Sequence, residues 1–406
     1  MAEMRGVFAL LLILLAGCVG PPALRESVLG YDETVSGLHQ QILLLNIARL
    51  GLDRPPHFTV TSSIAATFNF QTSAGITGTI IERAGDTVGF NLSSSAAENP
   101  TFSIVPISGQ EFTQRILTPV TEDVLSFFMF QGVRIELLGR LMGDALELLA
   151  PDGRTQQVYA NKVTSPDEYR TFRQLVLHLG SLQQRGQLFI NDLDFGQVVL
   201  DRVRQQPSTS DIVSAHAGGL AWNQNPDGTF TLSRAVRGRV LISNYDPRDL
   251  SDIERERLNR IASRNPENFV LIDVRPNHPG GDLPIFGALK LRSLFAMLDF
   301  VGKSIDLFPE FAVDPDPRIN VEICDSAEER PLPGPRICVR NPVQTLAIQV
   351  SNSAPLTNNP SIGFDGQYYT IGDTRWDRAT FVILYELFQV TVTDVSRVGI
   401  PITIAK

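Results

Sequence analysis

The stretch that decides the fold is Phe58–Gln71 (FTVTSSIAATFNFQ), in which apolar and polar residues alternate over fourteen positions. The even-numbered positions are apolar except for Ser62, and the odd-numbered positions are polar except for Ala65. Successive side chains of a β-strand point to opposite faces, so this period of two predicts one strand with an apolar and a polar face. The run is about twice as long as a usual strand.

The residues after this strand continue the β-pattern. Ile76–Glu82 and Thr87–Ser94 are rich in Ser, Thr and Gly, and Asn99-Pro100 is expected to end the segment. Phe58–Ser94 therefore predicts a long β-hairpin, for which the sequence leaves two interpretations open. The strands belong either to a half-buried sheet of a soluble region or to a transmembrane hairpin, since about 9–11 residues suffice for a tilted strand to cross a bilayer. One hairpin alone would leave its edges unsatisfied in lipid, so the second interpretation requires a ring of subunits.

Several helices are predicted from apolar residues at three- and four-residue spacing. The clearest is Asp32–Leu50, which Pro55-Pro56 ends. Ser165–Glu168 has the pattern of a capping box with proline at the first helical position, and it predicts a helix that runs to about Gln184. The other predicted helices are Thr121–Phe130, Val133–Leu149, Asp211–Ala221, Pro247–Ser263, Phe286–Gly302 and Trp376–Val390.

Short β-like runs lie between these helices. The predicted strands are Gln187–Ile190, Gln197–Val203, Thr229–Ser233, Arg239–Ser243, Phe269–Val274, Thr345–Ser351, Tyr368–Ile371 and a strand near Val398–Ile404. These patterns predict an α+β fold of mainly antiparallel strands and several amphipathic helices, behind a cleaved lipoprotein signal peptide. The predicted segments are a signal peptide at 1–17, a lipidated tether at 18–30, a helix and hairpin region at 31–108, a mixed α+β domain at 109–275 and a C-terminal α+β domain at 276–406.

The N-terminus carries an export signal. Arg5 precedes Val7–Ala16 (VFALLLILLA), an unbroken apolar run of ten residues. This is half the roughly 20 residues that a membrane-spanning helix needs, so the run is typical of the apolar region of a signal peptide. It ends in Leu15-Ala16-Gly17-Cys18, which resembles the lipobox of bacterial lipoproteins.

The lipobox resemblance implies cleavage before Cys18, a diacylglycerol on its thiol and an acyl chain on its new amino group. Three chains bury enough methylene groups, at about 0.8 kcal/mol each, to make anchoring effectively permanent. Val19 follows the cysteine where an aspartate would retain the protein in the inner membrane, so the resemblance implies export to the outer membrane. Pro21 and Pro22 predict an extended tether. The alternative is an ordinary secretory signal in which Cys18 has no role.

The two remaining cysteines, Cys324 and Cys338, predict a structural disulfide. They flank a 13-residue stretch, Asp325–Ile337, with a short β-like run on each side, so the expected structure is a clamped hairpin. An oxidising compartment favours the bridge, and loop entropy puts its gain near ~3 kcal/mol. The alternative is two buried free thiols.

Composition excludes some classes of function. The chain has 406 residues, 43% of them hydrophobic, and its net charge of -9 gives no electrostatic footprint for nucleic acid. The phosphate-binding loops G-x-x-x-x-G-K-[ST] and G-x-G-x-x-G are absent, as are H-E-x-x-H and G-x-S-x-G. The five histidines lack metal-ligand spacing, so no metal or other cofactor is expected. They are His39, His57, His178, His216 and His278.

Candidate catalytic groups do not form a convincing set. Asp211, Ser214 and His216 lie on one predicted helix, too close in sequence to supply a nucleophile and a base that converge in space. The acidic pair Asp192/Asp194 lies at a predicted turn. The pair Glu254/Glu256 lies two residues apart on a charged helix, so its members point to different faces. We therefore expect no enzymatic activity and no catalytic residue.

Several short blocks resemble a group of uncharacterised outer-membrane lipoproteins of proteobacteria. The blocks are Leu43–Leu50 (LLLNIARL) with Pro55–Phe58, Glu98–Phe102 with Val105–Gly109, Leu117–Pro119, Leu291–Leu294, and Tyr368–Ile371 with Thr380-Phe381. The resemblance extends over most of the chain after the signal peptide. It implies an outer-membrane location and no particular activity.

These features predict an outer-membrane lipoprotein with a non-enzymatic role, binding or scaffolding other proteins of an envelope complex. Its acyl chains are expected to hold it in the outer membrane facing the periplasm, and the sequence leaves a surface-facing orientation open. The alternative is a homo-oligomeric, ring-forming lipoprotein that contributes the Phe58–Ser94 hairpin to an outer-membrane pore. An envelope hydrolase is the weakest of the three hypotheses.

Overall fold

In the computed structural model, the chain divides into two compact units. The described residues are 20–79, 87–107, 109–319, 321–324, 338–392 and 402–404. The first unit contains the described parts of residues 1–46, 56–112 and 392–406, and the second contains those of residues 47–55 and 113–391. The predicted signal peptide at 1–17 lies outside the described residues.

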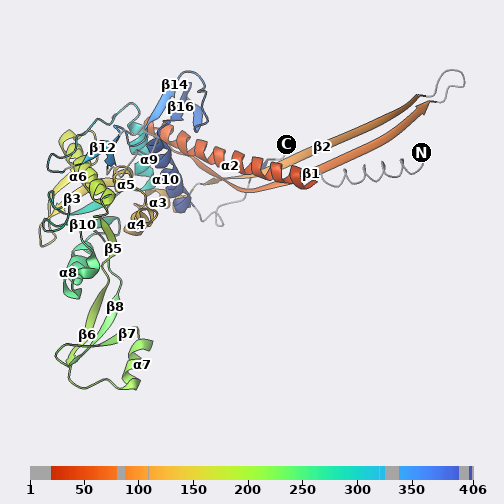
Figure 1. The fold of residues 1–406 in the computed structure, drawn as a ribbon. Coiled ribbons are helices and arrows are strands. Elements are labelled where there is room, and N and C mark those ends of the chain that lie inside the picture. The colour runs from red at the N-terminus through yellow and green to blue at the C-terminus, as the bar shows by residue number, and fades with distance from the viewer. Residues whose placement is uncertain are drawn as a thin grey trace. The chain divides into compact units, whose positions relative to one another are not determined.

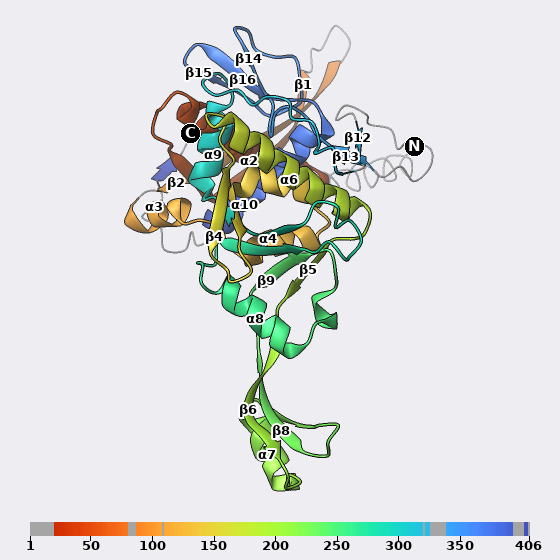
Figure 2. The ribbon, with the colours of Figure 1, turned by 90° about the vertical axis from the view of Figure 1, so that its left-hand side faces the viewer.

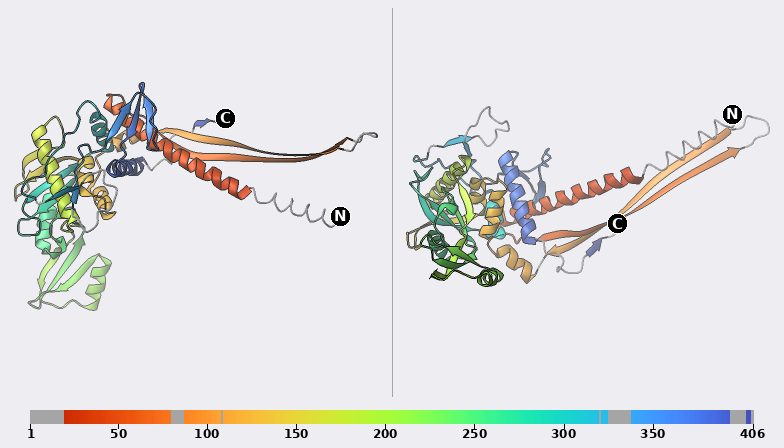
Figure 3. Two further views of the ribbon diagram at one scale, coloured as in Figure 1. Left: turned by 45° about the horizontal axis from the view of Figure 1, so that its top comes forward. Right: turned by 60° about the horizontal axis from the view of Figure 1, so that its bottom comes forward.

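The first unit contains a long β-hairpin. Strand β1 (Phe58–Thr79) pairs antiparallel with β2 (Thr87–Ile107) from Phe58 opposite Ile107 to Thr79 opposite Thr87. The two strands stay side by side along their length (Figures 1 and 3). A third, short strand, β17 (Ile402–Ile404), pairs with β2 near its C-terminal end. The predicted hairpin is therefore present, and it is longer than its predicted range.

Two predicted interruptions of the hairpin are wrong. Residues 72–75, which separate the predicted runs Phe58–Gln71 and Ile76–Glu82, lie inside β1, and Asn99-Pro100 lies inside β2, with Pro100 opposite Ala66. Proline cannot donate a ladder hydrogen bond, so strands accept it where one side has no neighbour. Strand β17 reaches β2 only at Phe102–Ile104, so among the described residues Pro100 has a neighbouring strand on one side.

Helix α2 (Gly20–Gly51) includes the predicted helix Asp32–Leu50 and begins twelve residues before it. The expectation of an extended tether is therefore wrong for residues 20–30. Pro21 and Pro22 lie in the first turn, where the missing N–H groups would have no helical partner in any case, so proline is tolerated there.

The second unit is built on a six-stranded sheet with the order β4-β3-β11-β10-β9-β5. Neighbouring strands are antiparallel except β9 and β10, which are parallel. The strands are β3 (Gly143–Leu149), β4 (Thr155–Ala160), β5 (Phe189–Asp192), β9 (Val240–Ser243), β10 (Phe269–Val274) and β11 (Ile285–Leu291). Leu258 and Ile261 of helix α8 (Asp252–Ala262) are in one buried cluster with Leu241 and Leu271 of the sheet. Figure 2 shows α8 beside β9 and β5.

Smaller sheets complete this unit. The first contains β6 (Phe195–Val203), β8 (Phe230–Val236) and β7 (Leu220–Gln224), with α7 (Thr209–Ala217) beside β7; the second contains β14 (Ile348–Ser351), β16 (Gln367–Ile371) and β15 (Ser361–Phe364); the third pairs β12 (Glu322–Cys324) with β13 (Cys338–Arg340). The other helices are α3 (Gln110–Leu117), α4 (Glu122–Phe130), α5 (Ile135–Met142), α6 (Pro166–Gln184), η1 (Pro247–Asp249), α9 (Leu294–Lys303) and α10 (Arg375–Val392). The predicted α+β class with mainly antiparallel strands is confirmed.

Two predicted helices are in part strands. Val133–Leu149 contains α5 and then β3, and Phe286–Gly302 contains β11 and then α9. Strands β3 and β11 are neighbours inside the six-stranded sheet, where tertiary pairing decides the structure of short apolar runs that fit a helix equally well. Ser293 caps α9, since its Oγ accepts a hydrogen bond from the N–H of Ala296 at 3.2 Å.

Three further helix predictions differ in detail. Helix α6 begins at Pro166 as predicted, but the Ser165 side chain makes no capping hydrogen bond. The predicted helix Asp211–Ala221 ends at Ala217, and β7 follows it. Pro247–Ser263 divides into η1 and α8. The predicted boundary at residue 275 lies between β10 and β11, which are antiparallel neighbours, so the segments before and after it share one sheet.

Candidate functional sites

Helix α2 holds the residues at the start of strand β1. The buried Asn46 side chain donates Nδ2 hydrogen bonds to the carbonyl oxygens of Ile42 and His57, both at 2.9 Å. Its Oδ1 accepts from the backbone N–H of His57 at 2.7 Å. The Phe58 ring then packs edge-on against Phe112 at 5.6 Å between centroids. The residues that lead into β1 are therefore held at two points.

Beyond these contacts, most of the hairpin is a two-stranded ribbon with no further neighbouring strand among the described residues. Its strands have 22 and 21 residues, which at about 3.3 Å per residue gives a length of about 70 Å. Among the described residues, β1 has β2 as its one neighbour, and β2 has β17 as a second neighbour at three positions. No described helix is both long and apolar enough to cross a membrane.

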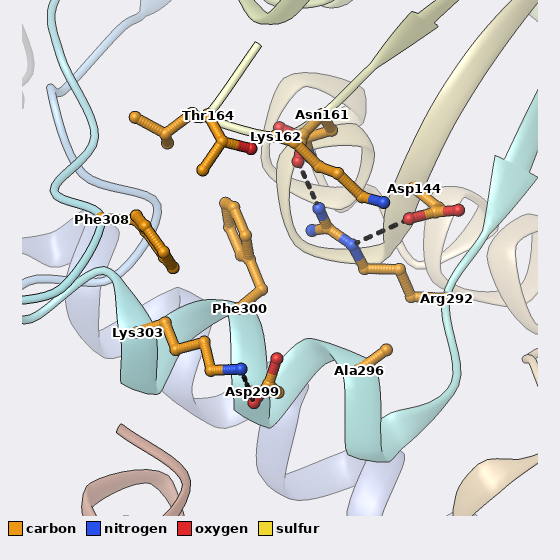
Figure 4. Close-up of a pocket in the computed structure, with 11 residues that line it drawn as sticks. Asp144, Asn161, Lys162, Thr164, Arg292, Ala296, Asp299, Phe300, Lys303 and Phe308 are labelled. Atoms are coloured by element: carbon orange, nitrogen blue, oxygen red, sulfur yellow. Dashed lines mark hydrogen bonds and ion pairs between the residues drawn. The ribbon is translucent and has the colours of Figure 1, made fainter. Parts of the chain in front are cut away.

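A cavity of about 350 Å³ lies in the second unit, and we call it the Arg292 pocket (Figure 4). It is formed by the start of β3, the loop after β4, the residue before the cap of α9, one face of α9 and the chain beyond it. The lining residues are Asp144, Asn161, Lys162, Val163, Thr164, Arg292, Ala296, Asp299, Phe300, Lys303 and Phe308.

The Arg292 guanidinium forms the polar wall of this pocket and is almost fully buried. Its Nη2 donates to the carbonyl oxygen of Asn161 at 2.6 Å, and its Nη1 donates to those of Arg140 and Leu141, both at 3.4 Å. The nearest carboxylate is Asp144, 3.9 Å from Nε. Burial lowers the pKa of Arg292 to about 10, so the group stays charged at neutral pH.

Two lysines add positive charge to the pocket. Lys303 Nζ lies 3.1 Å from Asp299 and 3.6 Å from Asp53, and the hydrogen bond with Asp299 holds the pKa of Lys303 above its ordinary value. Lys162 is exposed, and its ammonium group has no ion-pair or hydrogen-bond partner among the described residues. In Figure 4 its end lies on the same side of the pocket as Arg292 and Asp144.

Two aromatic rings lie beside the cationic groups of the pocket. The Phe300 ring lies 4.0 Å from the Arg292 guanidinium carbon, within the range of a cation–π contact. Phe308 is 41% exposed, so its ring has an accessible surface. Figure 4 shows these two rings next to each other, between Lys303 and Thr164. The pocket therefore combines positive charge with an apolar surface.

A second arginine cluster in this unit is closed. Arg140 and Arg173 lie 3.5 Å and 3.2 Å from the buried carboxylate of Glu310. Glu310 also accepts hydrogen bonds from the Tyr169 hydroxyl and the Thr345 hydroxyl, both at 2.8 Å. Burial raises the pKa of Glu310, but Arg140 and Arg173 together hold it below its ordinary value. The residues of this second cluster are buried and contact one another, which is typical of a structural network.

The predicted disulfide between Cys324 and Cys338 is present, with a Cα–Cα distance of 5.5 Å. The predicted hairpin around it is wrong, because β12 and β13 are parallel. Parallel neighbours need a connection of roughly a dozen residues or more, and Asp325–Ile337 supplies 13. The predicted lipidation site, Cys18, lies outside the described residues.

The histidines do not gather around a common centre. No group of three or more metal-ligating side chains occurs in the part of the chain that the structure describes. His178 is 2% exposed on α6, and burial lowers its pKa to about 4. His216 is exposed, His278 packs against the Tyr245 ring at 5.0 Å between centroids, and His39 has its pKa lowered by burial.

Three of the candidate carboxylates have local partners. Asp211 closes a capping box with Ser208, so it serves the first turn of α7. Asp192 pairs with Arg237 at 2.9 Å, and Glu254 pairs with Arg257 at 2.8 Å. A capping role or an ion pair therefore explains the position of each of the three carboxylates, and no catalytic role is needed to explain it.

Sequence reasoning missed the Arg292 pocket. Asp144 lies at the start of β3 and Lys162 lies just after the paired strand β4, whereas Arg292 is 130 residues beyond Lys162 and is brought to them because β11 pairs with β3. One available signal was the scarcity of lysine, because two of only four lysines line this cavity.

Comparisons with known proteins give no relative. No family model, no curated protein and no solved structure matches this chain.

Proposed function

We propose that the chain is an outer-membrane lipoprotein that acts by binding and scaffolding other envelope proteins through the β1–β2 hairpin. The single observation that carries this proposal is that, among the described residues, most of the hairpin has no further neighbouring strand. A two-stranded ribbon in water is marginal by itself, and its exposed backbone N–H and C=O groups are a template for further pairing. A partner that adds a strand or covers an edge satisfies these groups.

The lipobox supports the location. Acyl chains on Cys18 put the protein at the membrane surface, and α2 begins two residues later at Gly20. Anchoring in two dimensions raises the effective concentration of the hairpin for partners in the same membrane. Binding through the hairpin and anchoring through Cys18 are therefore parts of one proposed function.

Photo-crosslinking in intact cells tests the binding role. Benzoylphenylalanine at Phe70, within β1, is expected to give adducts with envelope proteins. The matched control is the same residue at Ile253, which is 78% exposed on α8 and outside the hairpin. Equal adducts from both positions, or none from Phe70, contradict the proposal.

The location has its own test. Cys18→Ser is expected to move the protein from the outer-membrane fraction to the soluble fraction. A Val19→Asp variant keeps the acyl chains and is expected to move the protein to the inner membrane. Retention of Cys18→Ser in the outer membrane would show that acylation does not hold the chain there.

The length of the hairpin also favours a second function, a ring of copies that forms an outer-membrane pore. The hydrocarbon core of a bilayer is about 30 Å thick, and the hairpin has roughly twice this length. Phe58–Gln71 has the alternation of a strand with a lipid-facing and a polar face. Planar-bilayer conductance from detergent-extracted oligomers is the expected result, and a non-conducting monomer contradicts this alternative.

A further inference from the structure

We propose that the Arg292 pocket binds a small organic anion, a single carboxylate or phosphate group attached to an apolar body. This site is independent of the hairpin and of the lipid anchor. Its volume of about 350 Å³ is at the lower end of the range of small-molecule sites, about 300–1,000 Å³. The proposal rests on the charge balance of the pocket, on Lys162 and on the two aromatic rings.

The charge at the polar wall is not neutralised within the protein. The carbonyl oxygens that accept from Arg292 satisfy its N–H groups but carry no net charge. Asp144, the carboxylate that forms an ion pair with Arg292, lies closer to Lys290, at 3.0 Å, than to Arg292, at 3.9 Å, and Asp299 in the same lining is paired with Lys303 at 3.1 Å. Because one carboxylate is shared between two cations, the pocket attracts a further anion.

Lys162 supplies an exposed cation at the same wall. The hydrogen bond from Arg292 Nη2 to the Asn161 carbonyl, at 2.6 Å, fixes the loop that carries this lysine. Its unpartnered ammonium is a point charge on a flexible stem, which suits a carboxylate or a phosphate without imposing one geometry. The chain uses Arg for 31 of its 35 basic residues, as the count of four lysines shows. A lysine without a partner at this cavity therefore differs from the buried, ion-paired arginines elsewhere in the unit.

The aromatic rings select for the apolar body. Phe300 and Phe308 lie beside the cationic groups, with Ala296 and Val163 completing the apolar lining. An inorganic ion would leave this surface in contact with water. A flat or short aliphatic body next to the anionic group buries it, at roughly 25 cal/mol per Å² of apolar surface.

Calorimetric titration of the full-length chain with 2-naphthoate tests the proposal. We expect one binding site, with weaker binding of the neutral isostere 2-naphthalenemethanol and of acetate, which lacks the apolar body. Parallel titration with 2-naphthyl phosphate identifies the preferred head group, and tighter binding of either anion supports the site. The absence of binding by both naphthyl anions at millimolar concentration overturns the proposal.

Two variants locate the binding to this pocket. Lys162→Gln is expected to weaken 2-naphthoate binding about fivefold, the effect of an exposed ion pair. Phe308→Ala removes a partly exposed ring and is expected to weaken 2-naphthoate while leaving acetate unchanged. The control Arg248→Gln removes the same charge from a side chain that is 75% exposed and outside the pocket lining. Unchanged affinity in both pocket variants, or an equal loss in Arg248→Gln, would assign the binding elsewhere.

Discussion

The hairpin and the six-stranded sheet are both antiparallel for most of their length, and they satisfy their backbones in different ways. Strand β10 has β9 and β11 as neighbours, and its residues Leu271 and Ile272 are at most 1% exposed. Strand β1 has more than three times as many residues and, among those described, one neighbouring strand. The inner strands of the sheet are paired on both sides within the chain, whereas among the described residues each hairpin strand is paired on one side for most of its length.

This difference predicts different effects of mutations in the two regions. The sheet is stabilised by buried side chains, so mutations there are expected to unfold the second unit. Changes in the hairpin are expected to alter what the protein binds and to leave that unit folded. Four changes, given from the largest expected effect to the smallest, test what stabilises the second unit.

Loss of the Glu310 carboxylate is expected to have the largest effect. Glu310→Ala leaves the buried guanidinium groups of Arg140 and Arg173 without their counter-ion, which costs about 3–5 kcal/mol of the free energy of unfolding. Chemical denaturation measures this loss. Glu310→Asp keeps the charge and serves as the control, so an Ala variant as stable as the Asp variant would contradict the structural role of the network.

Truncation in the sheet is expected to have the next largest effect. Ile272→Ala removes a fully buried side chain from β10 and should cost about 2–5 kcal/mol. The control is a shortened hairpin, in which Asn-Gly replaces residues 66–100 and joins Ala65 to Thr101, which are paired in the structure. Thermal unfolding of the second unit should not change in the shortened chain. A comparable loss in both would erase the distinction between sheet and hairpin.

Reduction of the disulfide is expected to have a smaller effect on stability, limited to the two strands that it joins. Cys324 and Cys338 join two three-residue strands, so the bridge contributes about 3 kcal/mol to the order of β12 and β13 by loop entropy. Hydrogen exchange at Val339 should increase after reduction, while exchange at Ile272 should not. Increased exchange at both residues would mean that the bridge holds the whole unit.

The smallest effect is the pH dependence from His178. Burial lowers its pKa from 6.5 to about 4, so below pH 6.5 the unfolded chain binds a proton that the folded chain does not. The free energy of unfolding should therefore fall as the pH falls from 6.5 to 4, by roughly 2–3 kcal/mol. His178→Gln should flatten this dependence, whereas His216→Gln, at an exposed position, should retain it. A steep dependence in His178→Gln would assign the proton to another group.

The sequence predicted elements whose periodicity is strong. The alternation of Phe58–Gln71 identified β1, the apolar run Phe269–Val274 matched β10 at both ends, and Pro166 marked the start of α6. Strands β3 and β11 were missed because short apolar runs fit a helix or a strand, and their pairing in the sheet decides the outcome.

The sites were harder to predict than the helices and strands, because they are formed by residues that are distant in the sequence. The disulfide was predicted because two cysteines remained once Cys18 was assigned, but the parallel pairing around it depends on the path of the chain between them. The Arg292 pocket was missed because Lys162 and Arg292 are 130 residues apart and have no shared motif. Periodicity is local, whereas a binding pocket is set by the order of strands in a sheet.

We propose that the hairpin joins this chain to other molecules in the outer membrane. The most direct test is the mass of the complex extracted from native membranes in mild detergent, for the full chain and for the chain with the shortened hairpin, measured by native mass spectrometry. We expect a complex of more than one chain for the full protein and a single chain for the shortened one. A single chain in both preparations, or the same complex in both, would contradict it.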